Sequence, residues 1–360
     1  MFLARLQPNV FVYSATISAC EKGSQWQQAL SFFRAMHEGK VQPNVISYSA
    51  MISAFEKGDG GQWQQSLNLF DRMISTTVEP NVITYNAIIS ACEKGGHWLQ
   101  ALNLFMAMSQ EKIQPDVISF NAAISACEKG NQWQQALNVF SAMPMATVQP
   151  DVISYSAIMS ACEKGAQWQQ ALSLFAAMSS AKLLANVVTF GAAISACQGQ
   201  WQQALILFEE MLMVEVEANC VCFSASISAC EKGGEWQPAL VLFSRMLMAR
   251  VRPNVIGCSA TISACEKGSQ WEQALYFFED MPAEQVQPDV IGFSATISAC
   301  QKGAQWQKAL SVFAAMPEAN VKPNVISFDA AIGACEKGGQ RQMALILLEE
   351  MRTAGCNIPS

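Results

Sequence analysis

Cysteine is the residue type in this sequence with the widest chemistry, because its thiolate can bind metals, form disulfides or act as a nucleophile. The chain has 13 cysteines, and most lie 35 residues apart, as Cys92, Cys127 and Cys162 do. Metal ligands instead cluster tightly and usually include histidine, whereas the only histidines, His37 and His97, lie outside any such cluster. The spacing therefore predicts small buried core residues, which suits a reducing compartment.

The cysteines belong to a longer phrase, such as VISFNAAISACEKGNQWQQALNVFSAM at 117–143, that recurs through the chain. Self-similarity at a fixed period indicates a repeat architecture. We place ten copies at 10–44, 45–81, 82–116, 117–151, 152–186, 187–219, 220–254, 255–289, 290–324 and 325–360. The segment 1–9 reads as the tail of a preceding repeat or an N-terminal cap. We therefore expect the chain to be a piece of a longer protein or to lack its true start.

Each copy predicts two helices. In the fourth copy Phe120, Ile124 and Cys127 lie at helical spacing and form one apolar stripe. Gly130 ends this helix, as glycine commonly does. The second helix begins near Trp133, and Pro150 closes the unit. A two-residue insertion near 59–60 and a two-residue deletion in the sixth copy both fall in the turn between the helices, where they cost least.

The repeats must stack, because one helical hairpin is too small to bury its own apolar face. The tryptophans and methionines that recur in the second helices are then core residues. We predict an all-α protein, an α-solenoid of about ten 35-residue helix-turn-helix repeats in a single array from 10 to 360.

The motifs within each copy narrow the class of repeat. Copies open with phrases such as VITYNAIISAC, continue with QALNLF and a methionine, and end in QPD or QPN. In this the chain resembles the pentatricopeptide repeat family over essentially its whole length. The tetratricopeptide pattern, with its Trp-Leu-Gly positions in the first helix, is absent. The resemblance implies a right-handed superhelix that holds single-stranded RNA in its inner groove and reads one base per repeat. It also implies a role in RNA processing, stability or translation in a mitochondrion or chloroplast, although no targeting peptide is visible.

The resemblance implies that two residues per repeat, the fifth and the last, read each base. In chain order these pairs are Ser14 with Asn44, Ser49 with Asn81, Asn86 with Asp116, Asn121 with Asp151, Ser156 with Asn186, Gly191 with Asn219, Ser224 with Asn254, Ser259 with Asp289, and Ser294 with Asn324. Ionised aspartate only accepts hydrogen bonds, so it suits uracil and guanine, whereas asparagine also donates and can match adenine. The family's code then gives a target near 5′-AAUUANAGA-3′. The tenth copy has Asp329 at its fifth position, but its end is out of register and is assigned no base.

The resemblance further implies that the second residue of each repeat clamps the bases. These residues are Phe11, Ile46, Ile83, Ile118, Ile153, Val188, Val221, Ile256, Ile291 and Ile326. Packing between neighbouring repeats would explain the same apolar residues, and the sequence does not separate the two uses.

A row of lysines recurs at the end of the first helices. Its members are Lys22, Lys57, Lys94, Lys129, Lys164, Lys232, Lys267, Lys302 and Lys337. A line of ammonium groups at repeat spacing fits phosphate binding along a single strand. The helix dipole alone would also favour lysine there. A glutamate precedes most of these lysines, and neighbours on a helix point about 100° apart, so we expect the glutamates to face elsewhere while diluting the positive field.

The net charge of −7 weighs against RNA binding, since most nucleic-acid-binding proteins are basic. A protein-binding helical scaffold is therefore the alternative, and a recently expanded array without a selected target is a third. Restriction of the two code positions to Ser, Asn and Asp, Gly191 apart, favours RNA.

No enzyme is predicted, because repeats use the whole chain and neither His-x-Glu nor Pro-Cys-x-x-Cys occurs. Cys220 and Cys222 form a lone Cys-x-Cys, so no metal and no cofactor are expected. We expect a monomer with RNA, and other RNA-processing proteins, as partners. No segment is apolar enough for long enough to cross a membrane.

Overall fold

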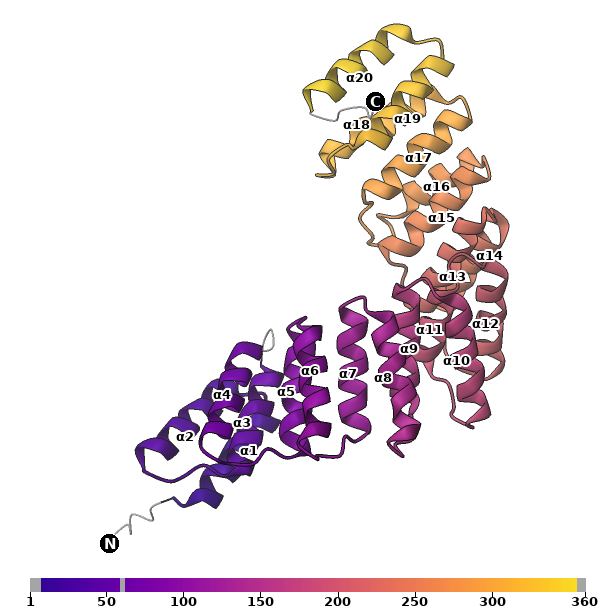
Figure 1. Ribbon diagram of the computed structural model, residues 1–360. Helices are drawn as coiled ribbons and strands as arrows, with labels where there is room; N and C mark the ends of the chain where they lie inside the picture. Colours follow the sequence, from indigo (N-terminus) through magenta and orange to yellow (C-terminus); the bar gives the residue numbers. More distant parts are fainter. Residues whose placement is uncertain (1–7, 59–61, 355–360) are drawn as a thin grey trace. The chain divides into compact units, whose positions relative to one another are not determined.

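In the computed structural model, residues 8–58 and 62–354 are described, and they form twenty α-helices and no strand. The odd-numbered helices are α1 (Val10–Lys22), α3 (Val45–Lys57), α5 (Val82–Lys94), α7 (Val117–Lys129), α9 (Val152–Lys164), α11 (Val187–Ala196), α13 (Cys220–Gly233), α15 (Val255–Lys267), α17 (Val290–Lys302) and α19 (Val325–Lys337). The even-numbered helices are α2 (Trp26–Glu38), α4 (Trp63–Ser75), α6 (Trp98–Gln110), α8 (Trp133–Met145), α10 (Trp168–Ser180), α12 (Trp201–Met213), α14 (Trp236–Met248), α16 (Trp271–Asp280), α18 (Trp306–Glu318) and α20 (Arg341–Thr353). Each odd helix and the even helix after it form a helix pair (Figure 1).

Three expectations fall on residues outside the described ranges. They are the tail or cap at the N-terminus, of which residues 1–7 are not described, the insertion near 59–60, and the out-of-register end after residue 354.

Every odd helix begins directly after an asparagine or aspartate that caps it. Asp151 shows the pattern: its Oδ1 accepts from the backbone N–H of Ser154 at 2.8 Å, and the Ser154 hydroxyl in turn accepts from the backbone N–H of Asp151. This capping box satisfies two of the donors that a helix N-terminus leaves unpaired. A cap of this kind stabilises a helix by about 1 kcal/mol. Cap and hydrophobic pattern together therefore fix where the helices start.

The helices divide into two compact units, residues 1–184 and 185–360, each of which stacks five helix pairs in chain order (Figure 1). Within each unit, every odd helix packs against the odd helices before and after it. The even helices lie close to odd helices and meet one another through side chains only, as Arg245 and Glu209 do. The odd helices thus form the tightly packed layer of each unit, and the even helices form a second, more widely spaced layer. This is the α-solenoid arrangement predicted from the sequence.

Aromatic residues join consecutive pairs. A phenylalanine of one even helix meets the aromatic residue at the fourth position of the next odd helix edge to face, as Phe105 and Phe120 do with ring centroids 4.9 Å apart. The same contact recurs at Phe208–Phe223 and at five other junctions. Such pairs add about 0.5–1.5 kcal/mol beyond area burial.

The predicted core is confirmed for methionine and for most of the cysteines, whereas the recurring tryptophans are only half-buried. One methionine in each even helix, or directly after it in the case of α16, is buried, with Met108 and Met143 both 0% exposed. The recurring cysteines are buried as well, except the half-buried Cys20, and Cys127 is 0% exposed with its pKa raised to about 11 by burial. All described cysteines are free, and no group of three or more His, Cys, Asp and Glu residues within 8–58 and 62–354 could hold a metal ion. None of the helices formed by these residues has the length and apolar character to span a membrane.

The glycine after each lysine was expected because glycine commonly ends a helix, but the structure gives a different reason for it. Gly130 has φ −80°, which any residue adopts, and the left-handed position is the following Asn131 at φ 55°. A Cβ on Gly130 would lie 2.4 Å from Cδ1 and Cγ of Trp98, the tryptophan of the preceding helix pair. Glycine is therefore needed for the close approach of this half-buried indole, and not for a left-handed helix cap.

Candidate nucleic-acid interface

The second, fifth and thirteenth residues of a repeat share one face of the odd helix. In α15 these are Ile256, Ser259 and Lys267. Ile256 and Ser259 are three residues apart, which makes them neighbours on a helix surface. Ile256 and Lys267 are eleven apart, or about three turns plus 20°. The face that carries all three residue types is called the code face below.

The last residue of each repeat, which is predicted to read a base, is also the N-cap of the next odd helix. The fifth residue bonds to it. Ser224 donates to Asn254 Oδ1 at 2.8 Å, and Ser259 donates to Asp289 Oδ1 at 2.8 Å. Asn121 Nδ2 likewise donates to Asp151 Oδ1 at 3.2 Å. The structure thus brings together the two members of these predicted pairs.

Capping fixes which atom of the last residue is left to meet a ligand. The backbone N–H groups that are capped need an acceptor, so Oδ1 of Asn254 and of Asp289 points into the helix. The atoms that remain are Nδ2 of Asn254, a donor, and Oδ2 of Asp289, an acceptor. No hydrogen bond within the described residues uses either atom. At a base edge the donor matches adenine N1, and the acceptor matches the imino N–H of guanine or uracil.

Hydrogen bonding also sets the charge of Asp151. Burial raises its pKa, but hydrogen bonds from the backbone and hydroxyl of Ser154 and from the amide of Asn121 outweigh burial and leave the pKa below its ordinary value. The side chain is therefore an ionised acceptor at neutral pH. Ser154 Oγ also lies 2.6 Å from Asn121 Oδ1, so its single hydroxyl proton is shared between this oxygen and Asp151 Oδ1, and both ends of the asparagine amide have a partner.

The serine or threonine at the third position of a repeat is a functional residue that the sequence analysis missed. Ser119 and Ser154 orient both members of the pair beside them. The available signal was the Asn/Asp-x-x-Ser/Thr spacing of a capping box.

The remaining code pairs differ in detail. Ser14 lies 3.4 Å from Asn44 Oδ1, and Ser49 bonds instead to Thr84 at 2.7 Å. Ser156 donates to the carbonyl of Val152 and belongs to the first unit, whereas its partner Asn186 belongs to the second.

Gly191 and Asp329 also lie on odd helices. Gly191 is buried, with Cys222 Sγ 3.6 Å from where a Cβ would be. Asp329 is exposed. Asn81, Asn219 and Asn324 cap α5, α13 and α19. Asn86 donates to Asp116 Oδ1 at 3.0 Å.

The second residues are exposed rather than packed between repeats. Ile83 is 62% exposed, Ile256 is 61% and Val221 is 56%. All ten members of this row are more than half exposed: Phe11, Ile46, Ile83, Ile118, Ile153, Val188, Val221, Ile256, Ile291 and Ile326. Their exposure at the same position of every repeat leaves these side chains available to a ligand.

A cleft lies on the code face along α15, α17 and α19. Its volume is about 290 Å³, and it is lined by Ile291 and Ile326, by Ser294 and Asn324, and by five neighbours. These four are the clamp residues and the code pair of the ninth repeat and its successor. The hydroxyl of Ser294 is buried and has no hydrogen-bond partner in the described part of the chain. An unpaired buried hydroxyl is costly, so the hydrogen-bonding capacity of Ser294 is left unused in this arrangement.

The lysines of the code face are mostly paired. Lys94 Nζ lies 2.6 Å from Glu56 Oε1 and Lys129 Nζ lies 2.5 Å from Glu93 Oε1. The glutamates that were expected to face elsewhere therefore contact the lysine of the following helix pair. Sequence reasoning considered only the adjacent Glu-Lys dipeptide and missed this longer-range partner.

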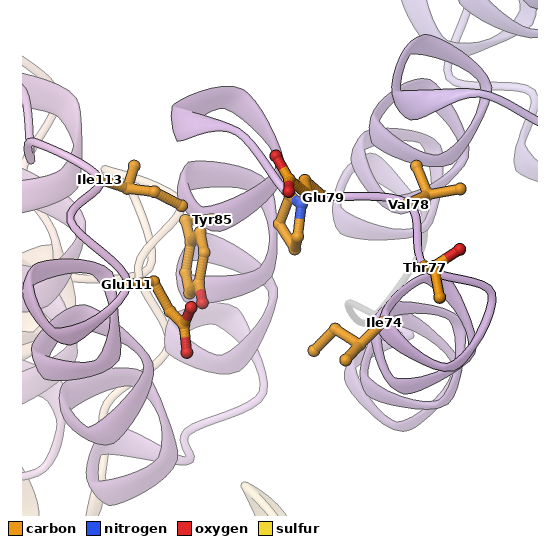
Figure 2. A pocket seen from close by; sticks show the side chains of 8 residues that line it. Ile74, Thr77, Val78, Glu79, Tyr85, Glu111 and Ile113 are labelled. Atoms are coloured by element: carbon orange, nitrogen blue, oxygen red, sulfur yellow. The ribbon is translucent and has the colours of Figure 1, made fainter.

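A different hollow of about 460 Å³ lies at the turns around helix pairs 2 and 3 (Figure 2). Ile74, Val78, Tyr85 and Ile113 supply apolar walls, and Glu111 lies near Tyr85. Burial and the charge of Glu111 raise the pKa of Tyr85. The lining has neither histidine nor cysteine.

Fold and code face together define a helical-repeat protein of the α-solenoid class. Models of the PPR repeat family match residues 8–57, 80–129 and 115–164, a pentatricopeptide repeat domain model matches 276–338, and a single PPR repeat model matches 153–183 and 326–356. The chain belongs to the pentatricopeptide repeat family.

The chain shares its fold with a solved structure. The crystal structure of the pentatricopeptide repeat protein PPR10 from maize matches 99% of this chain with a TM-score of 0.58 at 16% identity, and the match spans 60% of the maize chain. The same maize protein in complex with an 18-nt psaJ RNA element matches with a TM-score of 0.48 at 20% identity, over 99% of this chain and 56% of that one. Yeast Rmd9p in complex with a 16-nt target RNA gives a TM-score of 0.48 at 8% identity, over 96% of this chain and 90% of that one. A sequence comparison with curated proteins finds no match.

Proposed function

We propose that this protein binds single-stranded RNA along the code face, one base per repeat, with a preferred target near 5′-AAUUANAGA-3′. Membership of the pentatricopeptide repeat family supports RNA as the ligand. The pairing of fifth and last residues supports one reading site per repeat. The role would be in processing, stability or translation of an RNA in a mitochondrion or chloroplast, and it requires no catalysis by this chain.

The observation that carries the proposal is the cleft of the ninth repeat. Two exposed isoleucines, Ile291 and Ile326, line it together with Ser294 and Asn324, and the buried hydroxyl of Ser294 has no hydrogen-bond partner among the described residues. Apolar walls suit the two faces of a base, since stacking on such surfaces contributes about 1–3 kcal/mol per base for aromatic side chains and less for aliphatic ones. The polar side chains of the lining suit the Watson–Crick edge. Capping leaves the amide donor of Asn324 for the acceptor N1 of adenine.

Matched sites explain how bases are distinguished. The seventh and eighth repeats both have serine at the fifth position, in Ser224 and Ser259, and differ in the capping residue, Asn254 or Asp289. The first presents a donor and the second an acceptor. Adenine is therefore expected at the seventh base and guanine at the eighth.

The test is fluorescence anisotropy with labelled 5′-AAUUAUAGA-3′, a scrambled strand of the same composition, and the duplex, at two salt concentrations. The proposal expects tight binding to the first strand only, because the duplex hides the base edges that the code pairs contact. Equal binding to both single strands would keep RNA as the ligand and refute base reading. Absence of binding to all three, with helicity confirmed by circular dichroism, would refute the function.

A protein-binding scaffold is the second candidate, and one surface favours it. The even helices of the second unit expose a short apolar row, in which Ile206 and Val241 are each 57% exposed and Tyr276 is 63% exposed. The equivalent positions of the first unit are the polar Ser31, Asn68, Asn103, Asn138 and Ser173. Substitution of all three apolar residues by asparagine distinguishes the candidates, since RNA binding on the code face would be unaffected.

A further inference from the structure

Six lysines of the code face form ion pairs with glutamates of the preceding helix pair. The pairs are Lys57–Glu21, Lys94–Glu56, Lys129–Glu93, Lys164–Glu128, Lys267–Glu231 and Lys302–Glu266, with Nζ to Oε1 distances of 2.5–2.7 Å. We call these acidic residues the glutamate row. Each pair links two odd helices that already pack together.

The pairs are held more firmly than exposed ion pairs usually are. The glutamate side chains are only 13–18% exposed, whereas the lysine side chains are 38–44% exposed. Ser90 adds a hydrogen bond to Glu56 Oε1 at 3.0 Å. Lys267 and Lys302 also donate to the backbone carbonyls of Glu231 and Glu266. The carboxylate is thus a fixed, local counter-charge rather than a mobile group that leaves when a phosphate arrives.

A fixed carboxylate changes what a lysine offers to RNA. The favourable electrostatic part of RNA binding comes from ammonium groups that replace the counterions condensed on phosphates. A lysine that lies within 2.7 Å of a carboxylate contributes little net positive charge at the distance of a phosphate. The nearby carboxylate also repels the phosphate.

Three lysines of the row lack this counter-charge. Lys22 has no acidic partner among the described residues. Lys232 donates to the side-chain oxygen of Gln198, which is neutral. Lys337 faces the repeat in which Gln301 replaces the glutamate, and a Cβ at Gly333 would lie 2.0 Å from Gln301 Nε2. The amide of Gln301 therefore packs onto α19, and no described acidic residue pairs with Lys337.

We propose that the glutamate row neutralises six of the nine lysines, so that Lys22, Lys232 and Lys337 make the main electrostatic contacts to the RNA backbone. This inference rests on the proposed function. It explains how a code face lined with lysines fits a chain of net charge −7. The array would then depend on base contacts more than on backbone charge, which favours selectivity over affinity.

The test measures RNA affinity against salt for the wild type and for variants. Log affinity falls with log salt by about 0.7 per phosphate contact on a single strand. Three effective lysines predict a slope near −2, which is about a 20-fold loss between 50 and 200 mM salt. The triple variant Glu56→Gln, Glu93→Gln, Glu231→Gln frees three more lysines. Its slope should approach −4, about a 300-fold loss over the same range, with tighter binding at 50 mM.

A matched control separates local from overall charge. Glu38, Glu318 and Glu349 are exposed on even helices, and their substitution by glutamine changes the net charge by the same amount. The inference expects this variant to keep the wild-type slope. The variant Lys22→Gln, Lys232→Gln, Lys337→Gln should lose nearly all salt dependence.

Each outcome has a defined meaning. An increase in slope for the row variant but not for the control supports the inference, and misfolding cannot produce such a gain in affinity. Equal gains in both variants, or a wild-type slope near −6, would overturn it while leaving RNA binding intact. No RNA binding by any of these proteins, all helical by circular dichroism, would overturn the proposed function itself.

Discussion

The glycine that follows each lysine is the sharpest test of how helix pairs pack. At Gly130 a new Cβ would lie 2.4 Å from two ring atoms of Trp98, and at Gly23 the nearest heavy atoms would be 3.6 Å away. The two glycines have nearly the same backbone conformation, with φ −80° and −84° and ψ 5° and 4°. They also follow the same residues, Ala-Cys-Glu-Lys. Only the tryptophan of a preceding helix pair distinguishes them.

We predict that Gly130→Ala destabilises the protein and that Gly23→Ala does not. Real Cβ atoms do not approach within 3 Å of another heavy atom, so the indole and the turn must separate. Overpacking of this kind costs about 1–3 kcal/mol. At Gly23 the methyl group fits, and alanine reduces the entropy of the unfolded chain, which stabilises by about 0.4–1 kcal/mol.

The assay is urea unfolding of the full chain followed by far-ultraviolet circular dichroism. Gly130→Ala should lower the midpoint by roughly 0.5–1 M for a typical dependence on urea, and Gly23→Ala should leave it unchanged or raise it. The double variant Trp98→Leu, Gly130→Ala should lose less stability than the sum of the losses in the two single variants, because the clash with the indole is gone. Equal midpoints for Gly130→Ala and Gly23→Ala would refute the packing argument.

Three other predictions test the fold and the code face. Ala166, at φ 53°, occupies the same left-handed position of its repeat as Gly96, at φ 75°. Ala166→Gly should stabilise the protein by about 0.5–1 kcal/mol, and Gly96→Ala should destabilise it by a similar amount. Urea midpoints of the two variants test this prediction. Ile118 is 58% exposed and Ile124 is fully buried. Ile118→Ala should therefore weaken RNA binding and change stability by no more than about 0.5 kcal/mol, whereas Ile124→Ala should cost about 2–5 kcal/mol of stability. A loss of stability in Ile118→Ala would indicate that this residue packs between repeats and does not clamp bases. Burial raises the pKa of Cys92, Cys127 and Cys162 to about 11. Because the folded state then holds these thiol protons more tightly than the unfolded state, the stability of the protein should fall as pH rises from about 9 to about 11. Unchanged urea midpoints across that range would contradict this prediction.

Much of the fold follows from the sequence because local and global signals agree in every repeat. The Asn or Asp before Val152 and its counterparts caps a helix, and the stripe of Ile124 and Cys127 gives the buried face. The reason for Gly130 was not accessible in this way. Glycine after lysine resembles a left-handed cap, but the left-handed residue is Asn131, and the requirement comes from Trp98 in the previous helix pair.

For the code face, too, some features were predictable from the sequence and others were not. The positions of the code pairs came from the family resemblance, and the structure adds that the last residue of each pair is a helix cap whose Oδ1 is already used. The ion pairs were missed because their members lie 36 or more residues apart, as Lys267 and Glu231 do. Pattern reading compares neighbours on one helix, whereas these contacts form between equivalent helices of successive repeats.

The central claim is that the pair formed by the fifth and last residues of a repeat reads one base. The direct measurement is a reciprocal exchange. Asn121 and Asp151 form the fourth pair, and Ser259 and Asp289 form the eighth. Affinities by anisotropy are measured for Asn121→Ser and Ser259→Asn against 5′-AAUUAUAGA-3′ and its versions with G at the fourth base and U at the eighth. The account predicts that Asn121→Ser moves the fourth-base preference from U to G, and that Ser259→Asn moves the eighth from G to U, each without effect at the other site. Unchanged preferences in both variants, with wild-type affinity retained, would contradict base reading by these pairs.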